Sequence, residues 1–319
     1  MRLLSDNATV VISGTRIAEE LGTSRNEVWR AIEHLRELGV QITGHPATGY
    51  QLDSVPDLLL PEILSPLLKG TIFASRIHHF FRVGSTRVAA MQAAADDGPE
   101  GAVFVAEQQT AGRGRGGHSW ESAQSLGVYC SVVLRPVLSP GHALLLSLIA
   151  GIAVAEAVEQ TTSLHPDLRW PNDVLLNGRK FCGILTEMNA EPTRVRHVVV
   201  GIGINVNQPS FTGELEPIAT SLRIESGRQW SRVELTAALL KSLDSEYRKL
   251  IAGPAARAAV LRKFEERSSF ARARHVIVDE DGSYEGVTEG LDERGFLLVR
   301  TLGGLRTVLS GGVRALNGK

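Results

Sequence analysis

The dipeptide Asn177-Gly178 constrains the fold strongly, because it joins two β-rich runs. Asn-Gly is the best short-range signal for a two-residue hairpin, since both residues tolerate positive φ. Because several strands connect through hairpins rather than helical crossovers, we predict a mixed or largely antiparallel sheet and an α+β fold. The β-rich runs cover residues 71–82, 102–106, 126–135, 173–187 and 195–206, and helical patterns cover roughly 86–96, 140–160, 231–252 and 254–267.

A glycine- and arginine-rich stretch, Gly112 to Gly117, holds four glycines and two arginines in six positions. Glycines leave backbone N–H groups accessible, and arginine forks match phosphate and carboxylate oxygens, so the stretch suits a loop that wraps an anionic ligand. We expect it to be mobile until a ligand orders it. A plain surface loop or a nucleic-acid-binding Arg-Gly tract is the alternative. No helical pattern opens at Gly117 and no Gly-Lys-Ser/Thr follows, which argues against a dinucleotide fingerprint and a P-loop.

The hairpin around Asn177 places two charged residues near its strand ends. Asp173 comes just before the first strand and Lys180 starts the second, where we expect an exposed side chain. A carboxylate here could hold Mg²⁺, and an amine could meet a phosphate. The alternative is a surface hairpin with ordinary solvated charges.

Four stretches, read together, resemble the biotin protein ligase family over nearly the whole chain. They are Gly112 to Gly117, Trp170-Pro171-Asn172-Asp173, Lys180 with Gly183-Ile184-Leu185, and Gly201-Ile202-Gly203-Ile204-Asn205. The resemblance implies a central biotin/lipoate ligase-like catalytic domain. It also implies that biotin and ATP form biotinoyl-5′-AMP, from which biotin passes to a lysine of the biotin carboxyl carrier protein of acetyl-CoA carboxylase.

The same resemblance assigns roles by matching position. The biotin-binding residues would be Ser85, Thr86, Gln109, Gly112, Arg113, Arg115 and Lys180. The catalytic residues would be Arg115, Lys180 and Asp173, with Asp173 also holding Mg²⁺; the nucleotide-binding residues would be Trp120, Asn172, Asp173 and Asn205. A buried structural role is the alternative for Trp120. Arg87 stands where the family commonly has asparagine.

The N-terminal region has the spacing of a helix-turn-helix. Ser13 can cap a helix through Leu21, and Ser24 to Glu27 forms a capping box for a second helix ending at Gly39. A β-hairpin over residues 40–52 completes a winged helix, which resembles that of the biotin operon repressor.

The second helix would present Arg25, Asn26 and Arg30 to operator DNA. Against DNA binding, residues 1–52 hold five arginines and six acidic residues, and the family's first helix would be a stub around Leu3 and Leu4. A helix-turn-helix kept for packing or dimerisation is therefore the alternative.

The chain divides into three predicted domains. Residues 1–66 form the winged helix-turn-helix with a connector that contains a short helix, and residues 67–270 form the catalytic domain. Residues 271–319 carry short β runs punctuated by glycine pairs, which predicts an SH3-like C-terminal barrel.

Composition fits a soluble cytoplasmic protein. The net charge of -1 makes any DNA contact depend on a local patch, and two cysteines, Cys130 and Cys182, suggest neither disulfides nor a metal site. The longest apolar run, Ala143 to Ala155, is too short to span a bilayer and predicts a buried helix, so we expect no membrane association.

The sequence leaves two other functions open. A lipoyl or octanoyl transferase would share the core fold and could use Cys182 as a nucleophile, although a small buried cysteine is the simpler interpretation. A non-enzymatic ligand-responsive regulator is opposed by Arg115, Asp173 and Lys180 occurring together. For the ligase itself, we expect adenylate binding to stabilise a homodimer that binds an operator.

Overall fold

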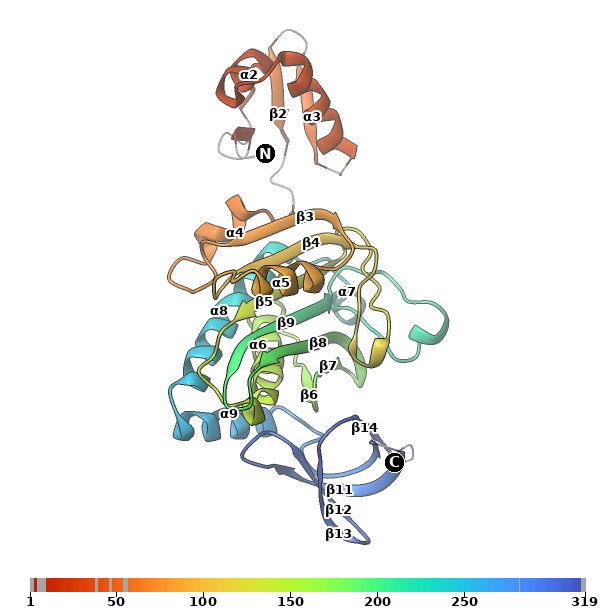
Figure 1. The fold of residues 1–319 in the computed structure, drawn as a ribbon. Coiled ribbons are helices and arrows are strands. Elements are labelled where there is room, and N and C mark those ends of the chain that lie inside the picture. Colours follow the sequence, from red (N-terminus) through yellow and green to blue (C-terminus); the bar gives the residue numbers. More distant parts are fainter. Residues whose placement is uncertain are drawn as a thin grey trace. The chain divides into compact units, whose positions relative to one another are not determined.

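The computed structural model describes residues 3–4, 10–37, 40–45, 48–53, 57–280 and 282–316. These residues form two compact units, Met1–Leu58 and Leu59–Lys319 (Figure 1).

The first unit contains the predicted helix-turn-helix and hairpin. Its elements are α2 (Gly14–Leu21), α3 (Arg25–Glu37), β1 (Ile42–His45) and the antiparallel β2 (Gly49–Leu52). Ser13 caps α2 by accepting a hydrogen bond from the Arg16 backbone N–H at 3.1 Å. The capping box of α3 is confirmed, because Ser24 Oγ accepts from the Glu27 N–H and the Glu27 carboxylate accepts from the Ser24 N–H. The predicted end of this helix, Leu38 and Gly39, lies outside the described residues.

A seven-stranded sheet dominates the second unit. Its order is β3-β4-β5-β9-β8-β7-β6, in which β3 and β4 are parallel and all other neighbours antiparallel, so the predicted mixed sheet is confirmed. The strands are β3 (Ile77–Val83), β4 (Val103–Gln109), β5 (Gly127–Leu134), β6 (Asp167–Arg169), β7 (Asp173–Leu176), β8 (Arg179–Ala190) and β9 (Val195–Asn205). Asn177 and Gly178, with φ of 48° and 77°, form the predicted two-residue turn between β7 and β8.

Helices cover both faces of this sheet (Figure 1). They are α5 (Thr86–Ala95) on one face and α6 (Leu144–Thr162) and α8 (Arg232–Ile251) on the other. The second unit also contains α4 (Pro61–Leu67), which packs against the edge strand β3, and the helices α7 (Leu222–Ser226) and α9 (Pro254–Glu266). Alternate residues of β5 point to opposite faces: Val132 packs in the large core with α6 and α8, whereas Val133 packs against α5.

Helix α6 is the predicted buried helix. The helical stretch Pro140–Thr162 is long and apolar enough to cross a membrane by length and composition, but 72% of its most apolar window is buried within the protein. It is therefore accounted for as the central core helix of the second unit.

The C-terminal part of the second unit is a five-stranded antiparallel sheet, curved in Figure 1, with the order β13-β12-β11-β10-β14. Its strands are β10 (Arg272–Asp279), β11 (Ser283–Leu291), β12 (Leu297–Thr301), β13 (Gly304–Val308) and β14 (Gly312–Ala315). The indole N–H of Trp170 donates to the Gly295 carbonyl at 2.9 Å, so this sheet joins the catalytic part. The connector helix α4 also belongs to the second unit, because Leu64 lies in its core.

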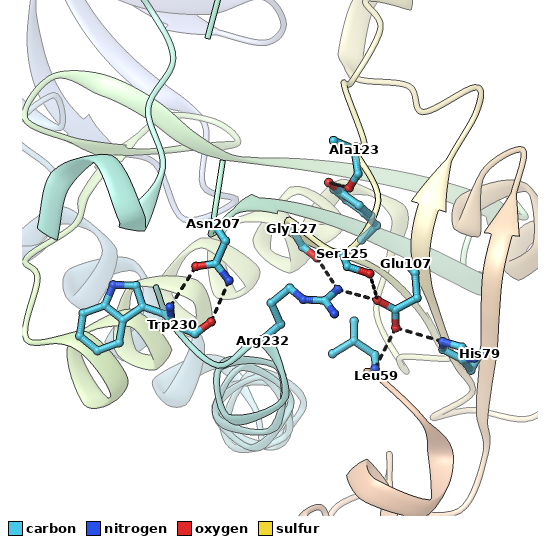
Figure 2. A network of polar contacts seen from close by, with 10 residues as sticks. Leu59, His79, Glu107, Ala123, Ser125, Gly127, Asn207, Trp230 and Arg232 are labelled. Carbon is cyan, nitrogen blue, oxygen red and sulfur yellow. Dashed lines mark hydrogen bonds and ion pairs between the residues drawn. The ribbon is translucent and has the colours of Figure 1, made fainter. Parts of the chain in front are cut away.

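A buried ion pair links five segments of the second unit (Figure 2). Arg232 Nη1 and Glu107 Oε2 lie 2.7 Å apart, and both side chains are 1% exposed. The other carboxylate oxygen accepts from the Leu59 N–H at 2.9 Å and lies 3.1 Å from His79 Nε2. Ser125 Oγ donates to Glu107 Oε2 at 3.1 Å. The network therefore fastens the connector, β3, β4, α8 and the segment that leads into β5.

Candidate active site

Most of the predicted ligand-binding residues line one pocket over β8 and β9. Those that line it are Ser85, Thr86, Gln109, Arg113, Arg115, Trp120, Asn172 and Lys180. The pocket has a volume of about 50 Å³, far below the roughly 300 Å³ or more of an ordinary ligand site. A biotin-sized ligand therefore requires the covering segments to move.

One part of the pocket is a cluster of uncharged donors and acceptors. Gln109 ends β4, and its Oε1 accepts from the Thr86 backbone N–H at 2.9 Å and from Thr86 Oγ1 at 3.1 Å. Its Nε2 donates to Ser122 Oγ at 2.9 Å. The Thr86 hydroxyl lies 2.9 Å from Ser131 Oγ on β5. Such neutral groups match a neutral polar ring better than a charged one, because they leave no charge uncompensated.

The floor of the pocket consists of paired glycines beneath an indole. Gly183 on β8 and Gly203 on β9 are register partners, and Trp120 lies against both. A Cβ atom at Gly203 would stand 2.6 Å from the Trp120 ring, so only glycine allows this approach. The Trp120 Nε1 is buried and has no hydrogen-bond partner among the described residues. Trp120 thus covers the floor, and its free N–H is available to a ligand.

The other part of the pocket carries charge. Lys180 Nζ lies 2.5 Å from Asp173 Oδ1, and Arg169 Nη2 donates to Asp173 Oδ2 at 2.6 Å. Burial alone would raise the pKa of Asp173, but the charges of Lys180 and Arg169 outweigh it and hold the pKa below its ordinary value. The prediction that Lys180 is exposed is wrong, because its side chain is only 32% exposed and pairs with Asp173. Its ammonium stays in the pocket because Asp173 anchors it.

The glycine- and arginine-rich loop folds into a narrow ladder across the pocket. The Gly114 N–H donates to the His118 carbonyl at 2.7 Å, and the Trp120 N–H donates to the Gly112 carbonyl at 3.0 Å. Arg115 donates to the carbonyl of Gly311, which precedes β14. Burial lowers the pKa of Arg115, and the nearby charge of Asp173 opposes that shift. The C-terminal sheet therefore contacts the loop directly.

Three predicted residues lie outside the pocket lining. Gly112 supports it, because a Cβ there would stand 2.5 Å from the Trp120 carbonyl. Asp173 pairs with Lys180, which does line the pocket. Asn205 is buried and committed elsewhere, since its amide donates to the Thr220 carbonyl and accepts from Gln208.

Two residues at the site carried no recognisable signal in the sequence. Ser131 lines the pocket from inside a buried strand, and Arg169, outside the lining, pairs with Asp173 across the Trp170 turn. Arg87, which the sequence marked as a departure from the family pattern, also lines the pocket and forms an ion pair with Glu187. Only the tertiary structure shows that Ser131 lines the pocket and that Glu187 is the partner of Arg87.

The cysteine alternative finds no support in the geometry. Cys182 is 0% exposed, and burial raises the pKa of its thiol, so it has little thiolate for nucleophilic attack. It packs in the hydrophobic core as a small apolar side chain.

The predicted DNA-reading residues share the solvent face of α3. Arg25, Asn26 and Arg30 are exposed, whereas Val28 and Ile32 of the same helix are buried. The arrangement leaves both arginines available to phosphate or base contacts.

Comparison with known proteins identifies the family. Residues 83–205 match the biotin/lipoate A/B protein ligase family, residues 1–51 an HTH domain and residues 274–313 the biotin protein ligase C-terminal domain. The bifunctional ligase/repressor BirA of Bacillus spizizenii is 35% identical over 97% of this chain and 95% of its own length. This chain belongs to the BirA family of bifunctional ligase/repressors. The BirA protein of Escherichia coli is 28% identical over 94% of this chain and 91% of its own length.

Solved structures extend the same relationship to the catalytic part. The biotin protein ligase of Aquifex aeolicus, solved in complex with biotin and ATP, is 29% identical, with a TM-score of 0.63. The alignment covers 75% of this chain and 98% of that protein. This chain therefore shares its catalytic fold with a solved biotin protein ligase, and the domain matches add a helix-turn-helix before it and a C-terminal domain after it.

Proposed function

We propose that this BirA-family protein forms biotinoyl-5′-AMP from biotin and ATP and then transfers biotin to a lysine of the biotin carboxyl carrier protein of acetyl-CoA carboxylase. The observation that carries the proposal is the division of one pocket into a neutral polar part and a charged part. Gln109 and Thr86 suit the urea ring of biotin, and Lys180 and Arg115 suit its carboxylate and the α-phosphate.

In the first step, a carboxylate oxygen of biotin attacks the α-phosphorus of ATP. The new C–O–P linkage forms as the bond to the bridging oxygen of pyrophosphate breaks. Lys180 would hold the carboxylate and the phosphate oxygens in line, and Asp173 would keep the ammonium charged and oriented. Arg115 would stabilise the negative charge that grows on the phosphate oxygens.

In the second step, the neutral amine of the carrier lysine attacks the acyl carbon of the anhydride. An amide forms, AMP leaves, and the amine loses a proton to solvent. The loop of residues 112–117 would cover the anhydride until the carrier arrives, which limits its hydrolysis by water. Trp120 would lie against the adenylate, with its free N–H available to an acceptor.

Magnesium would travel with the nucleotide. Among the described residues, no three His, Cys, Asp or Glu side chains gather to hold a metal ion. One carboxylate, Asp173, is near the charged part, and it already pairs with Lys180 and Arg169. This fits Mg²⁺ held mainly by phosphates and waters, with Asp173 as its protein contact, where the ion would neutralise phosphate charge.

The test is pyrophosphate release by the purified protein with ATP and each of biotin, lipoate and octanoate. Of the three acids, only biotin should support pyrophosphate release from ATP. ³H-biotin should then appear on a carrier domain only when the acceptor lysine of that domain is intact. Release with lipoate or octanoate but not with biotin would instead support a transferase of the same fold.

We also propose a biotin-responsive repressor of biotin synthesis that works as an adenylate-stabilised homodimer. The first 52 residues are near electrical neutrality, so one copy gains little from phosphate neutralisation, and two copies on a two-fold operator would supply the missing affinity. Carrier protein would relieve repression by consuming the adenylate. The two buried free cysteines are consistent with a reducing cytoplasm as the site of action.

A gel-shift titration on the promoter of a biotin synthesis operon, with parallel sedimentation, tests the repressor. Binding should rise steeply with protein concentration and require biotin with ATP. Arg30→Ala should weaken it at least tenfold without changing ligase activity, whereas Arg262→Ala, an exposed arginine on α9, should change neither. Tight binding by a ligand-free monomer contradicts the dimer mechanism, and no binding under any condition leaves a ligase alone.

A further inference from the structure

Arg87 occupies an unusual position for an arginine. It lies in the first turn of α5, where the helix dipole is positive and disfavours a cation, and that turn holds no acidic residue to offset it. The charge of Arg87 is balanced by another element, because Arg87 Nη1 pairs with the Glu187 carboxylate of β8. Helix stability therefore does not explain the arginine, and its place in the pocket lining suggests a ligand.

Glu187 continues the row of residues that forms the pocket floor. Residues two apart on a strand share a face, so Gly183, Leu185 and Glu187 follow one another on the same side of β8. The first two line the pocket. Four residues of extended strand place the backbone of Glu187 about 13 Å from that of Gly183, the floor glycine beneath Trp120. Glu187 therefore lies beyond the part of the floor that Trp120 and Lys180 cover, and Arg87, held by Glu187, lines the pocket at that end.

The Arg87 side chain also has an unused donor. Its Nε is buried without a hydrogen-bond partner among the described residues, although the side chain as a whole is 22% exposed. Leaving a buried donor unsatisfied is unfavourable, so such a group usually has a partner in the functional state. Since a guanidinium only donates, that partner must be an acceptor. Arg87 directly follows Thr86, whose hydroxyl belongs to the neutral polar cluster.

We propose that Arg87 is a specificity-determining residue that donates a hydrogen bond from Nε to the urea carbonyl oxygen of biotin, and that Glu187 is the positioning residue that holds it. The proposal rests on the proposed biotin-activating function. The urea oxygen is the one acceptor on the far side of the ring from the acyl chain, so it suits a donor at this end of the pocket. A substrate with a cationic group at that place would meet the guanidinium as a like charge.

The test pairs a change in the protein with a change in the ligand. Biotin and 2-iminobiotin, in which a protonated imino group replaces the urea oxygen, are compared as substrates for pyrophosphate release and in ATP-free binding at pH 7. Wild-type protein should prefer biotin strongly. Arg87→Met should raise the KM for biotin at least tenfold, leave the KM for ATP unchanged, and reduce the preference for biotin over 2-iminobiotin at least tenfold. Glu187→Gln should also raise the KM for biotin and reduce the preference for biotin over 2-iminobiotin, each by a smaller factor.

Arg179→Met is the matched control. Arg179 lies on the same strand and pairs with Glu225, outside the pocket lining, so its loss should leave the biotin preference unchanged. Thermal unfolding verifies that each variant folds. If Arg87→Met does not fold, the biotin preference of Glu187→Gln tests the proposal instead. An unchanged biotin preference in the folded variants overturns the proposal for Arg87. Absence of pyrophosphate release by the wild type would instead overturn the proposed function.

Discussion

At the scale of single residues, Lys180 carries the clearest prediction. Its ammonium pairs with Asp173, which keeps Arg169 as a second partner. Lys180→Ala should slow adenylate formation at least a hundredfold, because a charge at the reacting phosphate is lost, while costing only about 2 kcal/mol of folding free energy, because Asp173 keeps Arg169 as a partner. Single-turnover formation of biotinoyl-AMP and urea unfolding measure the two effects. Arg179→Ala, the preceding residue, removes an ion pair outside the pocket and should leave adenylation unchanged. Near wild-type adenylation by Lys180→Ala would remove Lys180 from the mechanism.

At the scale of elements, the loop of residues 112–117 is expected to be the moving part. The pocket beneath it has a volume of about 50 Å³, so this loop and Trp120 must shift to admit biotin and ATP. Trypsin should cleave after Arg113 or Arg115 in the ligand-free protein, since both are exposed, and at least tenfold more slowly with biotin and ATP. Cleavage after Arg294, in an exposed turn of the C-terminal sheet, is the internal control and should keep its rate. If the ligands slowed cleavage equally at all three sites, or slowed it at none of them, a loop that closes over the ligand would be contradicted.

At the scale of the whole molecule, the Glu107 network holds the second unit together and makes its stability depend on pH (Figure 2). Burial alone would raise the pKa of Glu107, but the hydrogen bond from His79 and the charge of Arg232 lower it overall. A lowered pKa in the folded state means that the stabilisation is complete above the unfolded value, about 4.3, and is lost as pH falls below it. Glu107→Gln should therefore cost about 3 to 5 kcal/mol at pH 7, because Arg232 stays buried without its counter-ion, and the deficit should shrink below pH 4. Urea unfolding of both proteins from pH 7 to pH 3 measures this. A deficit that is constant with pH would show that Glu107 contributes packing rather than charge.

The sequence by itself determined the local features and, through family resemblance, many of the site residues. The Asn177-Gly178 turn, the Ser24–Glu27 capping box and the burial of α6 depend on neighbours in the chain, so their patterns are readable without a structure. The tertiary structure alone decided which distant residues meet. Arg87 and Glu187 are 100 positions apart, Glu107 and Arg232 are 125 apart, and Arg115 and Gly311 are 196 apart. These pairs follow from strand order and helix packing, which no local pattern encodes. For the same reason the predicted exposure of Lys180 was wrong: its side chain is half-buried because Asp173 and Trp120 lie beside it, and only the folded sheet brings them there.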